Sequence, residues 1–350
     1  MGLSVDIEKR IGSFRLRVRF ETEGGVLGLL GASGCGKSMT LRCIAGIERP
    51  DRGRIVLNGR VLFDSKAHVD LPPQARRTGY LFQSYALFPN LTVRQNVEAA
   101  LHRLPRRERS GACDDLLRRM RLDALAHRRP ETLSGGEQQR TALARILASA
   151  PDVLLLDEPF SALDEHLKWQ VELELMQALQ GFSGQVIFVS HSRDEISRLC
   201  QAVCVLDEGC SAPVQTVEEL LRAPGTIGAA RVSGCENLSP LERRGAHLAF
   251  CPAWGASLRT AADLPADADW VGVRAHGLRP VDGMGENVLP CRPERVIDDV
   301  FREIWMLRPD GGTELLRMEL PKGSISHPGN RVWVQIPPEE VMPLRNHREW

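Results

Sequence analysis

The sequence has no long apolar run and no excess of charge of either sign. Its 350 residues include 45 Lys or Arg and 45 Asp or Glu, so the net charge gives no indication of a nucleic-acid partner. A membrane-spanning helix needs about 20 predominantly apolar residues. The longest apolar stretches, around Val153–Leu156 and Val186–Val189, are much shorter, and residues 1–10 contain no apolar signal segment. We therefore expect a protein that stays in the cytoplasm, or is held at a membrane by a partner.

The cysteines show no pairing pattern. There are nine of them, an odd number, and none forms a Cys-x-x-Cys pair. Cys200, Cys204 and Cys210 come nearest to a cluster, but their spacing fits no common metal-ligand pattern and no His accompanies them. They are better explained as small residues in and around a strand. Free thiols are typical of a reducing compartment.

The first part of the chain alternates short apolar runs with helical segments. Val26–Leu30, Val153–Asp157 and Gln185–Ser190 have the composition of buried strands. A helix is expected from Lys37 to about Ala45, because Gly46 suits its C-terminal cap. Alternation of this kind predicts an α/β domain with a largely parallel sheet and helices on its faces.

Two further regions differ from this pattern. Residues 102–129 contain nine Arg against four acidic residues, and no aromatic residue interleaves with them. We interpret them as the solvated face of a helical insert, since a nucleic-acid surface usually carries aromatic side chains. After about residue 215, short β-type runs separated by Gly, Pro and Asp predict a small all-β second domain.

A glycine-rich motif follows the first of these strands and opens the helix after it. It reads Gly31-Ala32-Ser33-Gly34-Cys35-Gly36-Lys37-Ser38 and matches G-x-x-x-x-G-K-[ST]. Glycines allow successive backbone N–H groups to point at phosphate oxygens, and the helix N-terminus adds a positive dipole end. Lys37 is expected to reach the β- and γ-phosphates of ATP, and the Ser38 hydroxyl to ligate Mg²⁺.

A second motif ends the strand Val153–Asp157. Asp157 and Glu158 lie at the end of this buried run, directly before Pro159. Such a pair suits Mg²⁺ handling by the first carboxylate and activation of water by the second. Alone this signal is moderate, because strands often end in Asp, but it is strong in a chain that also has a phosphate loop.

A third motif, Leu133-Ser134-Gly135-Gly136-Glu137, places a hydroxyl and bare N–H groups at a helix start, again suited to an anion. Here the sequence resembles the nucleotide-binding subunits of ABC transporters, whose hallmark is this LSGGQ-like signature. The Gln of the commonest form is Glu137, a frequent variant in importers. The resemblance implies a head-to-tail dimer of two copies, in which Ser134, Gly135 and Gly136 of one copy close on ATP bound by the other.

Further elements of that family follow in order. The resemblance implies that Gln83 is the glutamine that senses Mg²⁺ and water near a membrane partner. It also implies that Asp164, in Ser161-Ala-Leu-Asp164, crosses the dimer, and that His191 contacts the γ-phosphate. A lone His after a strand would more often be incidental. Its position behind the other motifs is what favours the catalytic role.

Two positions beside the phosphate loop are less regular. The family usually stacks adenine on an aromatic residue upstream of the loop, for which Phe14 and Phe20 are candidates and Phe14 is preferred. Both could instead be core residues of a strand. Met39 replaces the Thr that usually follows the Mg²⁺-ligating serine, and we still count Met39 among the residues around the nucleotide.

Within the family, the chain most resembles the ATPase subunits of molybdate importers. That resemblance implies a P-loop NTPase domain at residues 1–230, a helical subdomain at about 84–150, and a small OB-like β domain at 231–350. It also implies transmembrane permease subunits as partners, an indirect link to a substrate-binding protein, and a peripheral position on the cytoplasmic face of the inner membrane. The motifs that carry it are Ile55–Arg60, Leu71–Pro73, Arg76-Arg77, Gly79-Tyr80, Leu87–Pro89, Val271–His276 and Asn287–Arg292.

Other functions remain open at this stage. Importers of ferric iron, sulfate or polyamines share many of these motifs. A non-transport ABC ATPase acting on nucleic acid or ribosomes usually has two ATPase domains or a long coiled coil, whereas this chain has one phosphate loop and no sustained heptads. A regulatory oxyanion sensor with a vestigial ATPase is disfavoured by the complete motif set.

Overall fold

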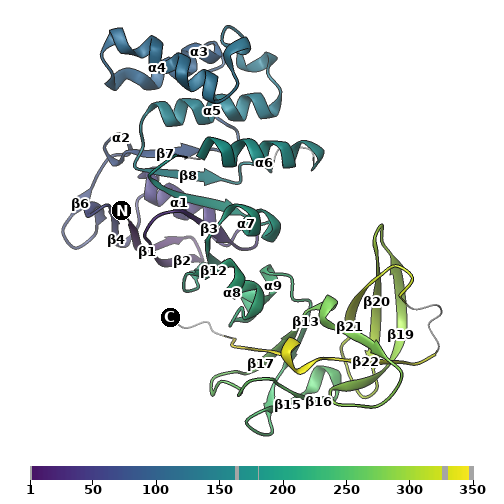
Figure 1. The fold of residues 1–350 in the computed structure, drawn as a ribbon. Coiled ribbons are helices and arrows are strands. Elements are labelled where there is room, and N and C mark those ends of the chain that lie inside the picture. The colour runs from purple at the N-terminus through teal and green to yellow at the C-terminus, as the bar shows by residue number, and fades with distance from the viewer. Residues whose placement is uncertain (1, 162–164, 180, 325–329, 347–350) are drawn as a thin grey trace. The chain divides into compact units, whose positions relative to one another are not determined.

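The protein folds into two compact units, Met1–Val217 and Glu218–Trp350 (Figure 1). The computed structural model describes residues 2–161, 165–179, 181–324 and 330–346. Side chains of residues 165–167 are also outside this description. Asp164, expected at the dimer interface, lies outside the described residues.

In the described part of the first unit, the strands form one twelve-stranded sheet. Its order is β6-β5-β4-β1-β2-β11-β10-β3-β9-β8-β7, with β12 also paired to β10. The strands are β1 (Leu3–Ile11), β2 (Phe14–Thr22), β3 (Val26–Leu30), β4 (Arg52–Leu57), β5 (Arg60–Asp64), β6 (Val69–Asp70), β7 (Thr78–Leu81), β8 (Val153–Asp157), β9 (Gln185–Ser190), β10 (Ala202–Asp207), β11 (Cys210–Ser211) and β12 (Gln215–Thr216).

The sheet has an antiparallel and a parallel part. Strands β10, β3, β9, β8 and β7 run parallel, and every residue of β8 and β9 is buried. Continuous burial is typical of strands covered on both faces. Strand β1 pairs antiparallel with β2 and with β4, and its burial alternates over its first five residues. The expected α/β fold with a largely parallel sheet is therefore confirmed for the part that carries the motifs.

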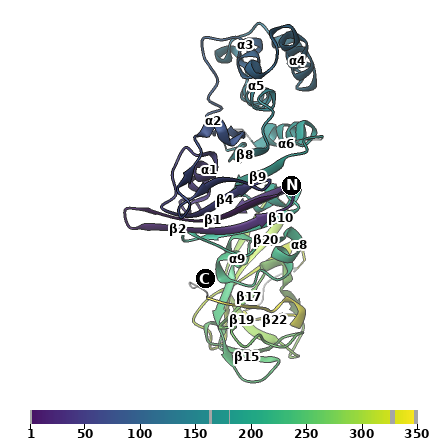
Figure 2. The ribbon, with the colours of Figure 1, turned by 90° about the vertical axis from the view of Figure 1, so that its left-hand side faces the viewer.

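Helices cover the parallel part and extend beyond β7. Figures 1 and 2 show α3, α4 and α5 as a cluster beyond that edge of the sheet, with α6 beside β8. None of the described helices is long and apolar enough to cross a membrane. The helices of this unit are α1 (Lys37–Ala45), α2 (Pro73–Arg76), α3 (Val93–Glu98), α4 (Arg106–Arg119), α5 (Gly135–Ala148), α6 (Glu165–Leu179) and α7 (Arg193–Leu199), with α8 (Val217–Arg222) at the boundary. Shorter 3₁₀ turns are η1 (Ala99–Arg103), η2 (Asp123–Leu125) and η3 (Pro130–Thr132).

Local signals in the sequence explain several of these elements. Helix α1 has the expected bounds, and Gly46 caps it in the left-handed conformation at φ 79°. Asn58 and Gly59, both at positive φ, form the turn between β4 and β5, as the Asn-Gly pair predicts. Helix α3 begins with a capping box in which the Thr92 side chain accepts from Gln95 N–H and the Gln95 side chain accepts from Thr92 N–H.

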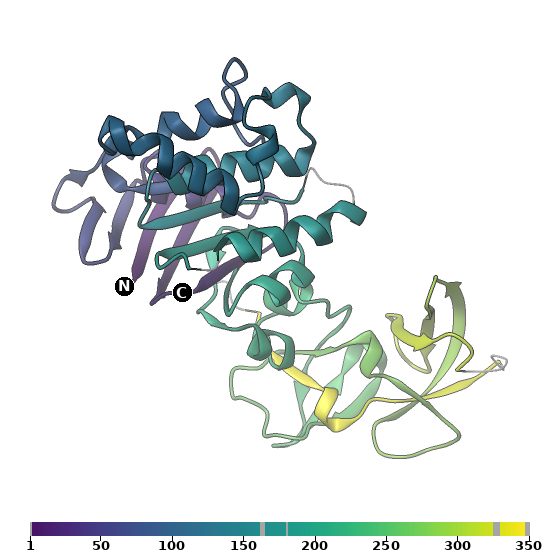
Figure 3. The same cartoon turned by 45° about the horizontal axis from the view of Figure 1, so that its top comes forward.

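In the described part of the second unit, three small sheets and two short helices form the fold. Figure 3 shows the green-to-yellow segment as mainly strands and loops, which confirms the expected β domain. The sheets are β13-β17-β23, β14-β15-β16 and β18-β22-β19-β20-β21. Their strands are β13 (Asn237–Pro240), β14 (Glu242–Arg243), β15 (Leu248–Cys251), β16 (Ala256–Arg259), β17 (Trp270–Val273), β18 (Arg279–Val281), β19 (Val288–Asp298), β20 (Arg302–Pro309), β21 (Leu316–Pro321), β22 (Val332–Gln335) and β23 (Met342–Leu344).

The segment 218–230, assigned from sequence to the first domain, packs on this second unit. The guanidinium of Arg274 donates to the carbonyl oxygen of Leu221 at 2.7 Å, within α8. Thr226 forms a bridge with Arg345, and Ile227 of α9 (Ile227–Val232) belongs to a hydrophobic cluster with Leu344. These contacts group α8 and α9 with the β sheets.

Candidate active site

The phosphate loop spans residues 31–36, between the end of β3 and the start of α1. Its backbone requires glycine at defined points. Gly34 and Gly36 have φ angles of 82° and 105°, which side-chain-bearing residues rarely adopt. At Gly31 a Cβ would lie 2.2 Å from the carbonyl oxygen of Leu206, so the close approach of β10 excludes any larger residue.

Lys37, the first residue of α1, turns its side chain back over this loop. Its ammonium donates to the carbonyl oxygens of Gly31 at 2.8 Å and Ala32 at 2.9 Å. It also lies 4.0 Å from a carboxylate oxygen of Glu158, and the Lys37 side chain is only 4% exposed. The loop therefore holds one buried cation at the N-terminus of a helix, an arrangement suited to phosphate groups.

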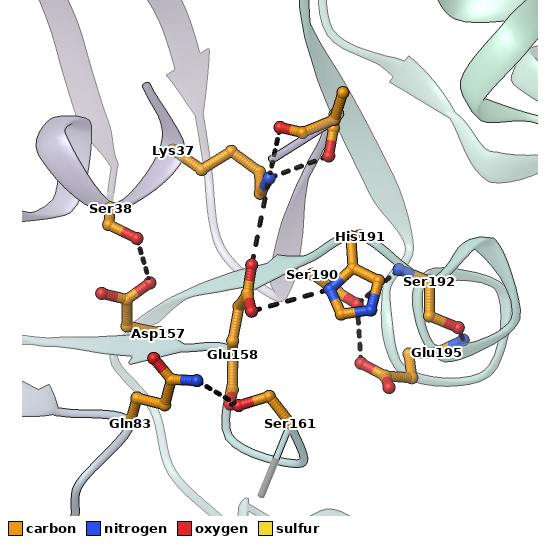
Figure 4. A network of polar contacts seen from close by, with 12 residues as sticks. Lys37, Ser38, Gln83, Asp157, Glu158, Ser161, Ser190, His191, Ser192 and Glu195 are labelled. Carbon is orange, nitrogen blue, oxygen red and sulfur yellow. Dashed lines mark hydrogen bonds and ion pairs between the residues drawn. The ribbon is translucent and has the colours of Figure 1, made fainter. Parts of the chain in front are cut away.

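Asp157 connects the phosphate loop to two strands. Its Oδ1 accepts from the Ser38 hydroxyl at 2.7 Å and its Oδ2 from the Tyr80 hydroxyl at 2.8 Å (Figure 4). The carboxylate is buried, and burial, aided by the charge of Asp157, raises the pKa of Tyr80. Tyr80 thus stays a neutral donor that fixes the orientation of Asp157. Ser38 and Asp157 together present the oxygen ligands that Mg²⁺ prefers.

Glu158 lies between the buried lysine and His191. Its second carboxylate oxygen is 3.6 Å from His191 Nδ1, and its own N–H donates to the carbonyl of Val189 at 3.2 Å. Glu158 has φ 44°, a left-handed conformation unusual for this residue type and typical of functional sites. The side chain is 23% exposed and that of His191 is 55% exposed, so both can meet a ligand from solvent.

Gln83 follows β7 and joins the same group. Its amide donates to the Ser161 hydroxyl at 2.9 Å, and that hydroxyl donates to the carbonyl of Glu158 at 3.0 Å. The structure therefore brings Lys37, Ser38, Gln83, Asp157, Glu158 and His191 into one connected cluster, which Figure 4 shows.

The two aromatic candidates occupy different environments. Phe20 is 3% exposed and belongs to the core. Phe14 is partly buried, and its ring lies 3.5 Å from where a Cβ on Gly36 would be. Phe14 is thus the aromatic residue beside the phosphate loop. Met39 is partly buried and packs against the same hydrophobic core, while Ala32, Ser33 and Gly34 are exposed.

The signature residues lie elsewhere, at the start of α5. Ser134 caps this helix by accepting from Glu137 N–H at 3.4 Å, and the Glu137 carboxylate accepts from Ser134 N–H at 2.8 Å. Among the described residues, no hydrogen bond or ion pair joins Ser134, Gly135 or Gly136 to the phosphate loop of the same chain. Glu137 therefore completes a capping box at the start of α5, as Gln95 does in α3.

Sequence reasoning missed two groups of this site. The Tyr80 hydroxyl contacts Asp157, and the adjacent parallel strands β7 and β8 could have suggested this proximity. Glu195, buried in α7, bonds to Ser190 beside His191. Ser192-x-x-Glu195 has the spacing of a capping box and could have marked the start of α7, but that pattern predicts a Glu near solvent, not one that bonds to Ser190.

The thiols form no site with these groups. All nine cysteines are free, and within the described ranges no three His, Cys, Asp or Glu side chains gather as metal ligands. Cys204 donates to the carbonyl oxygen of Ala212 at 3.2 Å, and burial raises its pKa to about 12. Cys200 and Cys204 are buried and Cys210 is partly buried, as small residues around a strand would be.

Comparison with known proteins agrees with this geometry. Residues 17–161 match the family described as ABC transporter. Three curated relatives are the molybdenum import ATP-binding protein ModC of Paramagnetospirillum magneticum, 44% identical over 64% of this chain, the spermidine/putrescine import ATP-binding protein PotA of Nitratidesulfovibrio vulgaris, 40% over 67%, and the Fe(3+) ions import ATP-binding protein FbpC of Haemophilus influenzae, 41% over 60%. The chain spans 61%, 60% and 60% of the lengths of these relatives, respectively.

A solved structure shows the same fold. The ATP-binding cassette MJ0796, in a dimeric post-hydrolysis state bound to ADP and Pi, superposes with a TM-score of 0.51 at 26% identity. The match covers 62% of this chain and 99% of that cassette. The phosphate loop, the acidic pair and the signature helix are therefore parts of one known architecture. The first unit of this chain belongs to the ABC transporter family and is an ABC-type ATPase domain.

Proposed function

We propose that this chain hydrolyses ATP to power the import of a small oxyanion, with molybdate as the first candidate, through a separate membrane permease. The observation that carries the proposal is the convergence of Lys37, Ser38, Asp157, Glu158 and His191 at the end of the parallel sheet. Each residue type matches a requirement of phosphoryl transfer to water, in which catalysis comes mainly from positioning and electrostatics.

The roles follow from the contacts. Lys37 neutralises phosphate charge from inside the loop, and loop N–H groups add donors. Glu158, whose side chain is mostly buried, polarises the attacking water, and His191, 3.6 Å from that carboxylate, contacts the γ-phosphate. Gln83 adds an amide that reaches the Glu158 backbone through the Ser161 hydroxyl. Phe14 supplies the surface on which adenine stacks.

Mg²⁺ is the cofactor that this donor set fits. Ser38 and Asp157 would hold it, with Gln83 close by, because Mg²⁺ is usually bound through one or two carboxylates together with substrate phosphates. The metal would neutralise charge on the phosphates during transfer. Tyr80 keeps the carboxylate of Asp157 aimed at the Ser38 hydroxyl throughout.

We further propose that two copies act as a head-to-tail dimer. The support is the position of Ser134–Gly136 at the start of α5. In the described residues, no hydrogen bond or ion pair joins them to the phosphate loop of the same chain. A hydroxyl and free N–H groups at a helix N-terminus can close on a nucleotide held by a partner copy. Asp164 would cross the same interface. Binding of ATP would then close the dimer, and hydrolysis would open it.

The membrane partner would be moved through the surface between Gln83 and residue 129. This surface begins at the site itself and includes α3 and α4, and four of the five arginines of α4 are exposed. The chain would act at the cytoplasmic face of the inner membrane, as a peripheral subunit that receives cargo indirectly from a substrate-binding protein. Nucleic acid has no part in this function.

Molybdate is preferred as cargo because the ModC relative has the higher identity, 44% against 40% for the polyamine relative and 41% for the ferric-iron relative. The β-rich second unit would serve as a regulatory domain that binds the oxyanion. Import of ferric iron, sulfate or a polyamine is the alternative. A non-transport ABC ATPase is disfavoured by the names of all three relatives.

ATP hydrolysis is tested with two variants. Lys37→Ala should lose nucleotide binding, because it removes the only loop cation described above. Glu158→Gln should bind ATP as tightly as wild type but turn over at least about 100-fold more slowly, as expected for loss of a general base. Equilibrium binding and phosphate release measure the two effects, with Glu294→Gln on the second unit as the control. An unchanged rate in Glu158→Gln would refute the assignment.

The cargo is tested in cells. Wild type and Lys37→Ala are compared after growth in limiting medium, and intracellular molybdenum, tungsten, sulfur and iron are measured by elemental mass spectrometry. A selective loss of molybdenum and tungsten supports an oxyanion importer. Lower iron or sulfur with unchanged molybdenum would assign the protein to a sister importer and leave the ATPase function intact.

A further inference from the structure

A buried carboxylate lies directly behind the turn that carries His191. Glu195, in α7, is 4% exposed and accepts a hydrogen bond from the Ser190 hydroxyl at 2.7 Å. It also forms an ion pair with Lys168 of α6. A buried carboxylate is costly unless it is paired and hydrogen-bonded, and Lys168 and Ser190 supply both interactions for Glu195.

The same network holds the backbone on both sides of His191. The Ser190 oxygen that donates to Glu195 accepts from the N–H of Ser192 at 2.8 Å. The Ser192 hydroxyl in turn accepts from the N–H of Glu195 at 3.4 Å. Figure 4 shows these residues around the imidazole. His191 itself bonds to none of them, and its side chain projects away from a turn that is fixed at both neighbours.

This turn is also connected to the backbone of the catalytic Glu158 by one hydrogen bond. The N–H of Glu158 donates to the carbonyl of Val189, the residue before Ser190. His191 Nδ1 lies 3.6 Å from the Glu158 carboxylate. A shift of the turn would therefore change the distance between the histidine and the group that activates water. Misplacement by about 1 Å can cost about 100-fold in rate.

A second ion pair joins the same two helices but does not touch the turn. Glu172 of α6, 2% exposed, accepts two hydrogen bonds from Arg198 of α7, at 2.8 and 2.9 Å. Both ion pairs connect α6 to α7, but only Glu195 also forms a hydrogen bond with Ser190. The chain thus contains its own control for separating helix docking from positioning of the histidine.

We propose that Glu195 is a positioning residue for hydrolysis, which holds the His191 turn through Ser190 and links it to α6 through Lys168. The inference rests on the proposed ATPase function and adds residues to its machinery. Since the contact acts on geometry after ATP is bound, its loss should lower kcat and leave the KM for ATP nearly unchanged.

The test compares full-length Glu195→Gln, Ser190→Ala and Glu172→Gln with wild type. Glutamine keeps the size of Glu195 but removes the charge that Lys168 pairs, and alanine at 190 removes the bridging hydroxyl. We expect kcat to fall about tenfold in both variants, which corresponds to about 1.4 kcal/mol in the barrier. KM should stay within about twofold. The Ser190→Ala and Glu195→Gln effects should be non-additive in the double variant, since the residues share one network.

Glu172→Gln should lower the unfolding temperature to a similar extent but keep kcat within about twofold of wild type. Rates are referred to the folded fraction, which circular dichroism measures at the assay temperature. Wild-type kcat in Ser190→Ala and Glu195→Gln, or an equal loss of kcat in all three variants, would overturn the inference. A wild-type chain without ATP hydrolysis would contradict the proposed function, and this inference with it.

Discussion

Arg76 tests how much the C-terminal end of α1, the helix that begins with Lys37, contributes to the stability of the first unit. Its side chain is fully buried and donates to the carbonyl oxygens of Leu71 at 2.7 Å, Cys43 at 2.8 Å and Ile44 at 3.0 Å. It also pairs with Asp70 at 2.8 Å. Cys43 and Ile44 belong to the last turn of α1, so Arg76 places a positive charge at the negative end of the helix that begins with Lys37.

The expected cost of Arg76→Met follows from these partners. Methionine fills much of the space of the arginine stem but removes one donor from each of three carbonyl groups and the nearer of two cations from Asp70, which keeps Arg49 at 3.5 Å. Breaking a buried ion pair costs about 3–5 kcal/mol, and hydrogen bonds to charged groups contribute about 1.5–3 kcal/mol each. Asp70 is 37% exposed and Cys43 also accepts from Gly46 N–H, so water and the cap recover part of this loss. We expect a net destabilisation of about 3–5 kcal/mol.

Calorimetry measures this effect. For a unit of this size, 1 kcal/mol corresponds to about 2–4 °C, so the unfolding temperature of the first unit should fall by about 6–20 °C. A non-hydrolysable ATP analogue identifies the transition, because a ligand raises the unfolding temperature of the unit that binds it. Below the transition, the variant should still bind the analogue.

The neighbouring residue gives the matched control. Arg77 is 44% exposed and makes one surface ion pair, with Asp152 at 3.2 Å, together with a hydrogen bond to a carbonyl oxygen. Arg77→Met should therefore cost less than about 1 kcal/mol. A loss in Arg76→Met no greater than that in Arg77→Met would refute the reasoning from burial and helix-end charge.

Two other predictions concern pH and Mg²⁺. Burial raises the pKa of all nine thiols, to about 12 for Cys43, Cys204, Cys251 and Cys291. Thiols of the unfolded chain ionise near pH 8.5, well below the pKa of the buried thiols. The free energy of unfolding should therefore fall above that pH, by up to about 1.4 kcal/mol per pH unit for each thiol. Equal urea midpoints under reducing conditions at about pH 7.5 and 9.5 would contradict this prediction. Tyr80→Phe should raise the Mg²⁺ concentration needed for half-maximal ATPase by about fivefold, because Asp157 loses a donor worth about 1 kcal/mol, and an unchanged Mg²⁺ titration would count against the role of Tyr80.

The sequence alone determined the features that depend on neighbouring residues. The apolar runs of β3, β8 and β9 identified buried strands because only strands covered on both faces need continuous apolar residues. Gly34 and Gly36 indicated a phosphate loop because such a loop needs positive φ angles, which glycine adopts readily whatever its tertiary surroundings. The motif set identified the family, and the comparisons confirmed it. The short β-type runs after residue 215 likewise predicted the sheets of the second unit.

The assignment of α8 and α9 was decided by packing rather than by composition. From the sequence, residues up to 230 were assigned to the first domain, but Arg274 donates to the Leu221 carbonyl and Thr226 bridges to Arg345. Such contacts join residues far apart along the chain, and no single stretch of sequence records them.

Only the tertiary structure decided how the site is assembled. Ser38 and Asp157, 119 positions apart, meet because β8 ends beside the helix that follows β3, with β9 between the two strands. The same sheet order brings Tyr80 to Asp157, and the packing of α7 on α6 brings Glu195 and Lys168 behind His191. These contacts depend on the order of strands and the register of helices, which are fixed by burial of the whole core. A local pattern can therefore name the catalytic residues, but it cannot name the residues that hold them in place.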